Sequence, residues 1–580
     1  MKAKLINENF TENYVINLLK FYGIKDIENY LNPDFNMLQS PLNLDNIHEG
    51  YELLKSKCEN NEHILIIVDS DVDGFTSAAI VYQYIKKIYP DIEISYLLHT
   101  GKQHGLQDHI DYLLENPIYG LVILPDSSSN DKEYHDQLAK FNINCLILDH
   151  HLTDVELSDN AVIINNQISS KYSNKDLTGA GIAYQFCRYL DKMYNVEYAD
   201  YFIDLAALGI NGDMGSLLDI ENRYIIKTGF ENIQNFFFKS LIEKQSFSMG
   251  GKVNPITVAF YIVPLINAMI RVGSMEEKDR LFRAFIDGTV MVPSNKRGAK
   301  GTEELLAVES ARECTNARAR QNRDLDKIME LLEIKIHKLG LLENKILFIE
   351  LDEENFPSEL NGLSAMKLAA KYKKPTLIGR VNNEGEIKGS IRNVNNCGLE
   401  SLKDFLTESK LFDYVQGHDN AAGYGIYKNK LDSFHKYANE KLKDINFYEN
   451  LYEVDFEFDC DKLELSKMVD ATLDVGLKSY LFGQGNPEPL FYLKNFKINK
   501  NNIRIIGKNH DTVKISGTGI DFIKFRCDED FIKKIENCCN SNKDYVINLV
   551  GKANLNEWNG GVTPQIFIDD IEIIDLMEGF

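Results

Sequence analysis

Apolar runs alternate with helical patterns between residues 60 and 155. Three short apolar runs end at an acid: HILIIV leads into Asp69, YGLVILP into Asp126, and NCLILD ends at Asp149. The segments between them have apolar residues at helical spacing. Strands that alternate with helices favour βαβ units and a parallel sheet, whose ligands lie beyond the carboxyl ends of the strands. We therefore expect the three acids at one edge of an α/β sheet.

The rest of the chain divides into further regions by the same criterion. Residues 176–290 have a mostly helical pattern, and strands and helices alternate again at 340–445. From about residue 450, short strands with turn signals favour a small β-barrel. The predicted parts are a leader (1–50), an α/β domain (51–295), a connector that is largely one helix (296–338), a smaller α/β domain (339–448) and a β-barrel (449–580).

Composition and charge narrow the class of protein. The 580 residues are 44% hydrophobic and 26% charged, as in a globular chain of several domains. A net charge of −23 argues against a uniformly basic coat for nucleic acid, although it leaves room for a local basic channel. Nine scattered cysteines without CxxC spacing indicate neither a zinc site nor a disulfide framework. We expect a cytoplasmic protein, since MKAKLINENF lacks a signal-peptide core and the apolar runs are expected to be too short for a membrane.

The stretch DSDVDGFTS follows the first of the three strands. It places Asp69, Asp71 and Asp73 at alternate positions, where like charges repel unless a cation neutralises them. Alone, such a stretch more often forms a solvated turn, but here it joins other strand-end acids and an adjacent pair of histidines. The candidate cluster comprises Asp69, Asp71, Asp73, Asp126, Asp149, His150, His151 and, after an apolar helix, Asp213.

Carboxylates combined with imidazoles suit hard divalent cations. Such donor sets bind Mn²⁺, Fe²⁺ or Mg²⁺ better than ions that prefer thiolates. Several carboxylates on one edge can bridge two ions about 3.5–4 Å apart, an arrangement used in phosphoester hydrolysis. One ion lowers the pKa of a water, and both stabilise charge on the phosphoryl oxygens. The sequence therefore predicts two divalent ions, with Mn²⁺ favoured and Mg²⁺ as the alternative.

Four motifs in order resemble the DHH phosphoesterase family: DSDVDGFTS, LPDSSS, LILDHH and LGINGDMGSL. Further along, QGHDNAAGYGI at 416–426 resembles the DHHA1 domain that accompanies DHH domains. The segments YLFGQGNPEPLF at 480–491 and NLNEWNGG at 554–561 resemble the OB-type region of RecJ exonucleases, and YLNPDFNMLQSP resembles their leader. The resemblance covers nearly the whole chain. It implies an α/β fold with a parallel-sheet DHH domain, a long connecting helix, a smaller α/β DHHA1 domain and a C-terminal OB-type β-barrel.

The chain departs from the family pattern at several places. LPDSSS stands where an Asp-Cys-Gly type of turn is usual, and QGH stands where Gly-Gly-His is usual. Near LLHTGKQHGL, where RecJ proteins tend to carry an arginine for the 5′ phosphate, the basic candidates are His99 and Lys102. These changes weaken the case for 5′-phosphate recognition but leave the acids intact. Such divergence fits a distant, virus-encoded branch.

The resemblance implies a role for each residue of the cluster. Asp126 bridges both ions, and Asp69 completes or supports the first site. Asp149 orients a neighbouring histidine and so fixes its tautomer, while His151 contacts the scissile phosphate. The implied metal ligands are Asp69, Asp71, Asp73, Asp126, His150 and Asp213.

Five further residues are implied to bind phosphate. His418 approaches the substrate phosphate from the second domain, and Ser390 with Arg392 clamps a 5′-terminal phosphate by charge-assisted hydrogen bonds. Arg271 in NAMIRVG is a second phosphate candidate, and Lys102 stands near the place of the missing arginine. Each of them would be an ordinary surface or turn residue if it stood alone.

A basic stripe and one aromatic residue are candidates for contacts with a nucleic-acid strand. Residues 296–323 carry seven Lys or Arg and four Glu, a local +3 in an acidic chain. The spacing places Arg312 and Arg320 on one helical face, which could follow a DNA backbone, although such stripes are more often simply solvated. Trp558 in the barrel is a candidate for base stacking, although most barrel aromatics belong to the core.

The leading hypothesis is a metal-dependent 5′→3′ exonuclease that hydrolyses single-stranded DNA to 5′-mononucleotides in DNA repair or recombination. One alternative is a DHH phosphodiesterase for short oligoribonucleotides or cyclic dinucleotides, which predicts that deleting residues beyond about 450 leaves activity intact. Another is a non-catalytic RecJ-like replication scaffold, a class that usually lacks strand-end acids. We expect a monomer that binds single-stranded DNA, with a single-strand-binding protein or a helicase as candidate partners and no membrane.

Overall fold

The computed structural model describes residues 1–7, 12–101, 103–153, 155–299, 301–351, 357, 360–394, 397–448, 451–540, 544–558 and 560–575. The chain forms two compact units, each discontinuous in sequence. Unit 1 comprises Met1–Gly23, Asn322–Ser479 and Glu488–Phe580, and unit 2 comprises Ile24–Gln321 and Tyr480–Pro487. Helix α14 (Leu306–Lys338) continues from unit 2 into unit 1.

The described residues of unit 2 form a five-stranded parallel sheet at its centre. The strands lie in the order β3-β2-β4-β5-β6, and every neighbouring pair is parallel. Because the chain moves from one side of β2 to the other between β3 and β4, the carboxyl ends of β2 and β4 border the crevice where such sheets bind ligands. This confirms the predicted parallel α/β sheet. Its strands are β2 (Ile64–Val68), β3 (Ile94–Leu98), β4 (Leu121–Pro125), β5 (Asn144–Asp149) and β6 (Ala161–Asn165).

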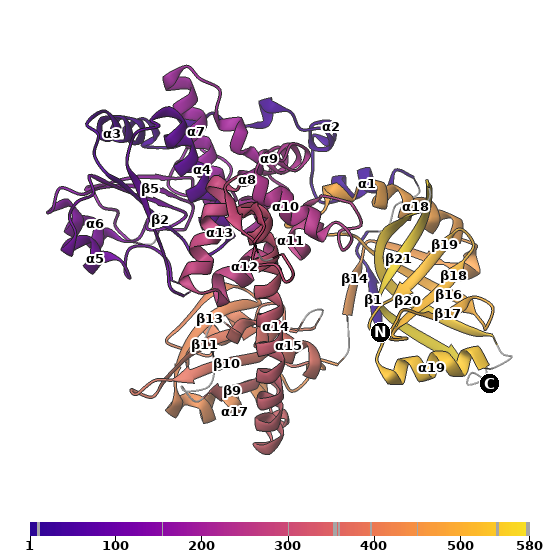
Figure 1. The fold of residues 1–580 in the computed structure, drawn as a ribbon. Helices are drawn as coiled ribbons and strands as arrows, with labels where there is room; N and C mark the ends of the chain where they lie inside the picture. Colours follow the sequence, from indigo (N-terminus) through magenta and orange to yellow (C-terminus); the bar gives the residue numbers. More distant parts are fainter. Residues whose placement is uncertain are drawn as a thin grey trace. The chain divides into compact units, whose positions relative to one another are not determined.

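Helices cover both faces of this sheet. Ile64 and Ile66 of β2 pack into one core with α3, α4 and α7, whereas Leu65 and Ile67 pack into a second core with α5 and α6 (Figure 1). Burial on both faces explains why the strands are continuous apolar runs rather than alternating ones. The helices of unit 2 are α2 (Ile27–Leu31), α3 (Ile47–Glu59), α4 (Val72–Ile88), α5 (Ile110–Glu115), α6 (Lys132–Ala139), α7 (Gly179–Tyr194), α8 (Ile203–Gly212), α9 (Ile220–Glu231), α10 (Phe236–Gln245), α11 (Pro255–Tyr261), α12 (Val263–Val272) and α13 (Met275–Asp287).

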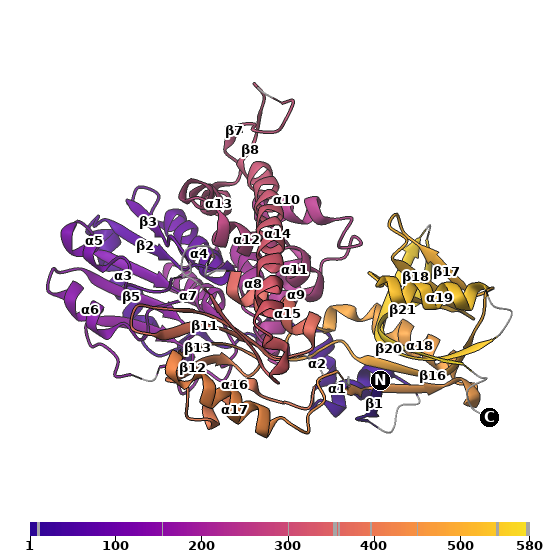
Figure 2. The ribbon, with the colours of Figure 1, turned by 90° about the horizontal axis from the view of Figure 1, so that it is seen from below.

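One expectation about apolar runs is wrong. The stretch Pro255–Val272, which spans α11 and α12, has a mean hydropathy of 1.6 over 18 residues and so meets the length and composition of a membrane span. Half of this stretch is buried inside the protein, and core helices pass the same test. A hairpin of β7 (Met291–Pro293) and β8 (Glu303–Leu305) then leads into α14, as Figure 2 shows.

Unit 1 contains a second α/β layer, a mixed sheet in the order β12-β13-β11-β10-β9. Its neighbours are antiparallel except for the parallel pair β9–β10. The strands are β9 (Leu347–Leu351), β10 (Thr376–Val381), β11 (Glu386–Arg392), β12 (Tyr414–His418) and β13 (Ala421–Tyr427), with helices α15 (Asn361–Tyr372), α16 (Leu402–Glu408) and α17 (Leu431–Lys441).

A seven-stranded mixed sheet forms the C-terminal part of unit 1. The strand order is β15-β16-β20-β21-β19-β18-β17 in the described residues. The chain's first strand, β1 (Lys2–Leu5), pairs in parallel with β14 (Leu451–Val454), and α1 (Tyr14–Phe21) packs on α18. The remaining elements are β15 (Phe456–Asp459), α18 (Leu465–Leu477), β16 (Leu490–Ile498), β17 (Ile503–Ile506), β18 (Thr512–Gly517), β19 (Ile520–Lys524), α19 (Glu529–Asn540), β20 (Tyr545–Trp558) and β21 (Gly561–Asp575).

The compact units are a coarser division than the five predicted domains, so the predicted boundaries stay a prediction. Two segments nevertheless belong to a different unit from the one that their predicted domains suggested. Residues 1–23 of the predicted leader belong to unit 1, and residues 480–487, predicted as part of the barrel region, belong to unit 2.

Candidate metal centre

The first acids of the centre lie where β2 turns into α4. Asp71 caps this helix, and its carboxylate accepts a hydrogen bond from the Gly74 N–H at 3.0 Å. Asp73 lies in the first helical turn, where the helix dipole favours negative charge. Its Oδ1 accepts hydrogen bonds from the Thr178 hydroxyl at 2.9 Å and the Ala180 N–H at 3.1 Å. Sequence order and helix geometry therefore hold two carboxylates at one strand end.

Asp126 lies at the end of the neighbouring strand β4, with a left-handed backbone of φ 69°. Such a conformation at a residue other than glycine costs roughly 1–3 kcal/mol and recurs at functional sites, although turns elsewhere in this chain adopt it as well. The His150 Nε2 lies 3.2 Å from Oδ1 of Asp126 and 3.5 Å from Oδ2 of Asp213, the residue that ends α8. Two distant segments thus bring carboxylates to one imidazole, which a third segment supplies.

Asp149, at the end of β5, organises the two histidines that follow it. Its Oδ1 accepts hydrogen bonds from the His150 N–H at 2.7 Å and from the His151 ring at 2.7 Å, and its Oδ2 accepts one from the Ser129 N–H at 3.0 Å. These donors all belong to the protein, which is the arrangement expected of a carboxylate that orients a histidine; the role of Asp149 stays a prediction.

Three buried carboxylate oxygens in this centre have no hydrogen-bond donor among the described residues. They are Oδ1 of Asp69, Oδ2 of Asp73 and Oδ1 of Asp126; the approach of His150 to Asp126 lacks hydrogen-bond geometry. A buried acceptor without a donor costs about 1–3 kcal/mol, and more when it is charged. Cations between these oxygens would remove that cost, so the residues fit the predicted divalent ions.

The candidate ligand atoms form three overlapping groups, each with all atoms within 4.8 Å of one another. Asp126 belongs to two of the groups, and so does His150, which suits a centre with two ions that share a bridging residue. The groups are Asp126 with His150 and His151, Asp73 with His150 and Asp213, and Asp69 with Asp71 and Asp126.

The electrostatics separate the carboxylates into two kinds. Burial and neighbouring acids raise the pKa of Asp126 well above its ordinary value and that of Asp213 to about 8. Burial also raises the pKa of Asp69 to about 6, although His104 opposes the shift. The pKa of Asp149 lies well below its ordinary value: burial would raise it, but His151 and the other donors outweigh burial. The carboxylates of Asp69, Asp126 and Asp213 therefore have too little neighbouring positive charge to offset their burial, whereas the carboxylate of Asp149 has enough.

The two histidines also differ. Burial lowers the pKa of His150, which keeps the imidazole neutral as a metal ligand must be. For His151 burial acts in the same direction, but the hydrogen bond to Asp149 prevails and raises its pKa to about 9. His151 is therefore a half-exposed imidazolium at neutral pH.

All eight residues of the predicted cluster lie together, and their individual roles stay a prediction. The centre also includes His104, which the sequence did not indicate and whose Nδ1 lies 2.6 Å from Oδ2 of Asp69. A single histidine in a polar loop cannot be recognised as part of a site from one sequence. Arg271 of α12 is near enough for its charge to interact with Asp71, and burial lowers the pKa of this guanidinium.

The second predicted phosphate site lies on the mixed sheet of unit 1. Arg392 of β11 and His418 of β12 both pair with Ala421 of the strand between them, which places all three at one end of the sheet. Ser390 is two residues from Arg392 and so shares its face. Within β12, Gly417 has φ +127°, and a Cβ there would lie 2.9 Å from the backbone of its partner Ala422 in β13. The register therefore brings Ser390, Arg392 and His418 together.

The predicted basic stripe on α14 is engaged by carboxylates. Arg312 donates two hydrogen bonds to Glu304, one of them at 2.6 Å, and Arg320 donates to both oxygens of Glu277 at 2.8 and 2.9 Å. The prediction that these arginines follow a DNA backbone is untested, but in this conformation each already has a partner. Lys102 lies outside the described residues, as does the Trp558 side chain.

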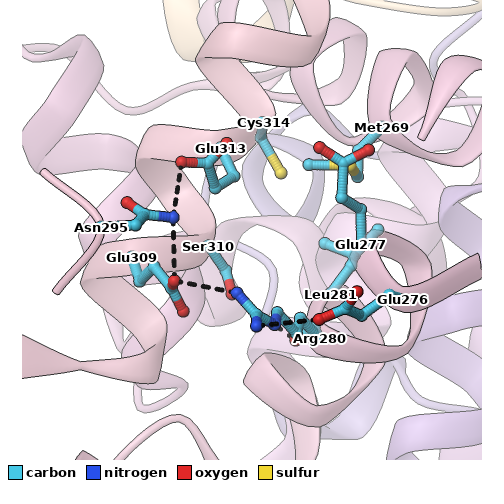
Figure 3. A pocket seen from close by; sticks show the side chains of 10 residues that line it. All are labelled: Met269, Glu276, Glu277, Arg280, Leu281, Asn295, Glu309, Ser310, Glu313 and Cys314. Carbon is cyan, nitrogen blue, oxygen red and sulfur yellow. Dashed lines mark hydrogen bonds and ion pairs between the residues drawn. The ribbon is translucent and has the colours of Figure 1, made fainter. Parts of the chain in front are cut away.

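A cavity of about 140 Å³ lies beside this stripe in unit 2. Figure 3 shows Asn295 and Arg280 reaching toward Glu309, and Asn295 also bonds Glu313. Its carboxylates are thus held by ion pairs and hydrogen bonds within the protein. The cavity has none of the strand-end acids, so we assign the chemistry to the metal centre instead. Its lining is Met269, Glu276, Glu277, Arg280, Leu281, Asn295, Glu309, Ser310, Glu313 and Cys314.

Comparison with known proteins agrees with this geometry. The N-terminal domain of the DHH family matches residues 63–210, and the RecJ OB domain matches residues 461–570. A Bacillus subtilis protein, named as an SPbeta prophage-derived single-strand DNA-specific exonuclease, YorK, is 37% identical over 581 residues, covering 99% of this chain and 98% of that protein.

More distant relatives include a single-stranded-DNA-specific exonuclease RecJ of Bacillus subtilis, 23% identical over 92% of this chain and 64% of that protein. The crystal structure of RecJ with Mn²⁺ from Thermus thermophilus shares the fold, with a TM-score of 0.70, 17% identity and coverage of 96% of this chain and 75% of that one. The same fold, the two matching domains and the full-length relative lead to one assignment: the chain belongs to the DHH family and is a RecJ-like member of it.

Proposed function

We propose that the chain is a metal-dependent 5′→3′ exonuclease that hydrolyses single-stranded DNA to 5′-mononucleotides in DNA repair or recombination. The observation that carries the proposal is the set of donorless carboxylate oxygens at the ligand-binding edge of the parallel sheet. Relatives named as single-strand DNA-specific exonucleases span nearly the whole chain, which supports the substrate class. The OB-domain match adds a module that commonly binds single strands without sequence preference.

The metal centre would hold two divalent ions on Asp69, Asp71, Asp73, Asp126, His150 and Asp213, with Mn²⁺ favoured over Mg²⁺. When bound, such ions lower the pKa of water and stabilise charge on phosphoryl oxygens. His151 lies beside these ligands, and in the metal-free protein its pKa of about 9 keeps the ring protonated at neutral pH. Asp149 fixes the direction of that ring through its Nδ1, so Nε2 is left to donate a hydrogen bond to the scissile phosphate.

In this proposal the phosphate-binding group in unit 1 determines which end of the strand is cleaved first. Ser390 and Arg392 would hold the 5′-terminal phosphate, and His418 would bind a further phosphate oxygen. Arg271 belongs to unit 2 and would bind phosphate near Asp71. Arginine suits this role because its planar fork matches phosphate bidentately. A strand held by its 5′ end would present its first phosphodiester for hydrolysis, which yields 5′-mononucleotides.

Digestion of a single-stranded DNA oligonucleotide labelled at either end, with Mn²⁺, tests the proposal. We expect 5′-labelled mononucleotides from the wild type and none from Asp126→Asn, which keeps the size of the side chain. Asp324→Asn, at an exposed acid of α14, is the matched control and should retain full activity. First release from the 3′ end would refute the direction, and cleavage by Asp126→Asn would refute the metal centre.

The alternatives predict different substrates or none. A phosphodiesterase for short oligoribonucleotides or cyclic dinucleotides would cleave those faster than long single strands, and the OB-domain match argues against it. A non-catalytic scaffold would cleave none of these, and the complete set of strand-end acids argues against that. Within our proposal the protein acts in the cytoplasm as a monomer, with a helicase or a single-strand-binding protein as its partner.

A further inference from the structure

Residues 480–487, an excursion of the C-terminal half of the chain, pack with unit 2. Unit 2 contains the candidate metal centre and is called the catalytic unit below. Ser479 and Glu488, on either side, belong to unit 1, whereas Tyr480–Pro487 belong to unit 2. Barrel strand β16 begins three residues after this segment. The segment is therefore covalently continuous with the barrel, although its own packing is with the catalytic unit.

The segment holds the loop that follows Asp213. The Leu217 N–H donates to the Gln484 carbonyl at 2.8 Å, and the Leu217 carbonyl accepts from the Tyr30 hydroxyl at 3.1 Å. Both backbone groups of this buried residue are thus satisfied by segments far away in sequence. Within the unit, the Asn222 amide also bonds the Ser216 carbonyl at 3.1 Å.

The same network extends through buried polar side chains. The Asn486 amide donates to the Tyr30 hydroxyl at 3.2 Å and to the Leu481 carbonyl at 2.9 Å. Arg223 donates through Nε to the Tyr30 carbonyl, and its guanidinium lies 4.5 Å from the Tyr30 ring and 5.7 Å from the Tyr480 ring. Tyr30, Arg223 and Asn486 are nearly inaccessible to solvent. Such interactions are strong when desolvated, and their loss leaves buried groups unsatisfied.

We propose that residues 480–487 are a positioning element for Asp213, the metal ligand that ends α8. Asp213 is tied to α8 through its own N–H, and the loop beyond it is fixed four residues later at Leu217 by the excursion. The inference rests on the proposed function, because that proposal makes Asp213 a ligand. Residues that orient metal ligands typically change metal affinity by about 10- to 100-fold when they are altered.

This placement changes how a truncation is interpreted. Removing residues beyond about 450 also removes the segment that holds Leu217, so the deletion would damage the metal centre directly. Loss of activity after such a deletion therefore gives no information on whether the barrel binds the substrate. Point variants within the segment are the informative perturbation.

Two variants test the positioning role, and Mn²⁺ binding by calorimetry is the readout. Gly485 has φ +76°, and a Cβ there would collide with Ser216, so Gly485→Ala should displace the loop. Asn486→Ala removes the bond to Tyr30 without adding volume. Gly519→Ala is the matched control, because Gly519 has φ +80° in the β18–β19 turn and its Cβ would meet ordinary contacts.

We expect Gly485→Ala and Asn486→Ala to weaken Mn²⁺ binding at the site that Asp213→Asn weakens, by about 10-fold or more. Combining either one with Asp213→Asn should weaken that site no further, because both act through the same carboxylate. Wild-type Mn²⁺ affinity in both folded variants, or additive losses in the double variant, would overturn the inference. If Asp213→Asn itself leaves Mn²⁺ binding unchanged, the proposed metal centre fails instead.

Discussion

Replacing Asp69 by Asn is expected to stabilise the metal-free protein while weakening its metal centre. Asp69 is 1% exposed, and burial raises the pKa of its carboxyl from 3.8 to about 6 in spite of His104. The raised pKa means that ionisation costs the folded state free energy. This cost is absent below about pH 4, grows as pH rises, and is complete above about pH 6.

The magnitude follows from the size of the shift. About two pH units at about 1.4 kcal/mol each give about 3 kcal/mol at pH 7, as an upper estimate for the cost of the Asp69 charge. An Asn side chain has no such charge and can still accept the His104 hydrogen bond. Metal-free Asp69→Asn should therefore unfold at a higher urea concentration than wild type at pH 7, with the difference vanishing near pH 4.

Asp149→Asn is the matched comparison, because Asp149 is also 1% exposed. Its pKa is held below the ordinary value, so its charge stabilises the folded protein at every pH above about 4. Loss of a charged acceptor with several donors should cost at least about 2 kcal/mol. Urea unfolding in EDTA at several pH values measures both variants. The reasoning is refuted if Asp69→Asn destabilises the protein at pH 7, or if its effect does not depend on pH.

Two further predictions concern the groups outside the cluster. Arg320→Gln should leave the salt dependence of single-strand binding unchanged, because Glu277 already neutralises Arg320; a slope smaller by about 0.7 would instead show a phosphate contact. His418→Ala should slow cleavage by about 100-fold while Mn²⁺ binding stays at the wild-type level, since His418 is not among the candidate metal ligands in the described residues; weakened Mn²⁺ binding would instead make it a ligand.

The strand-end acids could be predicted because a strong physical rule connects pattern to position. Continuous apolar runs imply strands covered on both faces, such strands are parallel, and parallel strands end at the same edge. Asp69, Asp126 and Asp149 therefore had to meet. The left-handed backbone of Asp126 has no such signal, because it depends on how the loop after β4 packs.

The ion-pair partners of the arginine stripe could not be predicted from the sequence. Helical spacing places Arg312 and Arg320 on one face, but their carboxylate partners lie in β8 and α13, and spacing along one helix contains no information on those elements. The contact of His104 with Asp69 and the packing of residues 480–487 with unit 2 could not be predicted for the same reason. Each acts through a contact between segments whose distance is set by packing of the whole unit.

The parallel pair of β1 and β14 has a consequence for the time course of folding during synthesis. Lys2 pairs with Leu451, so at about 5–20 residues per second the first strand waits roughly 20–90 s for its partner. Until then its edge is unpaired, and exposed edges pair with other chains. The catalytic unit also waits, since Tyr480–Pro487 are made after the rest of it. Slow translation or a crowded polysome should therefore lower the yield of active protein more than it lowers the yield of the parallel sheet.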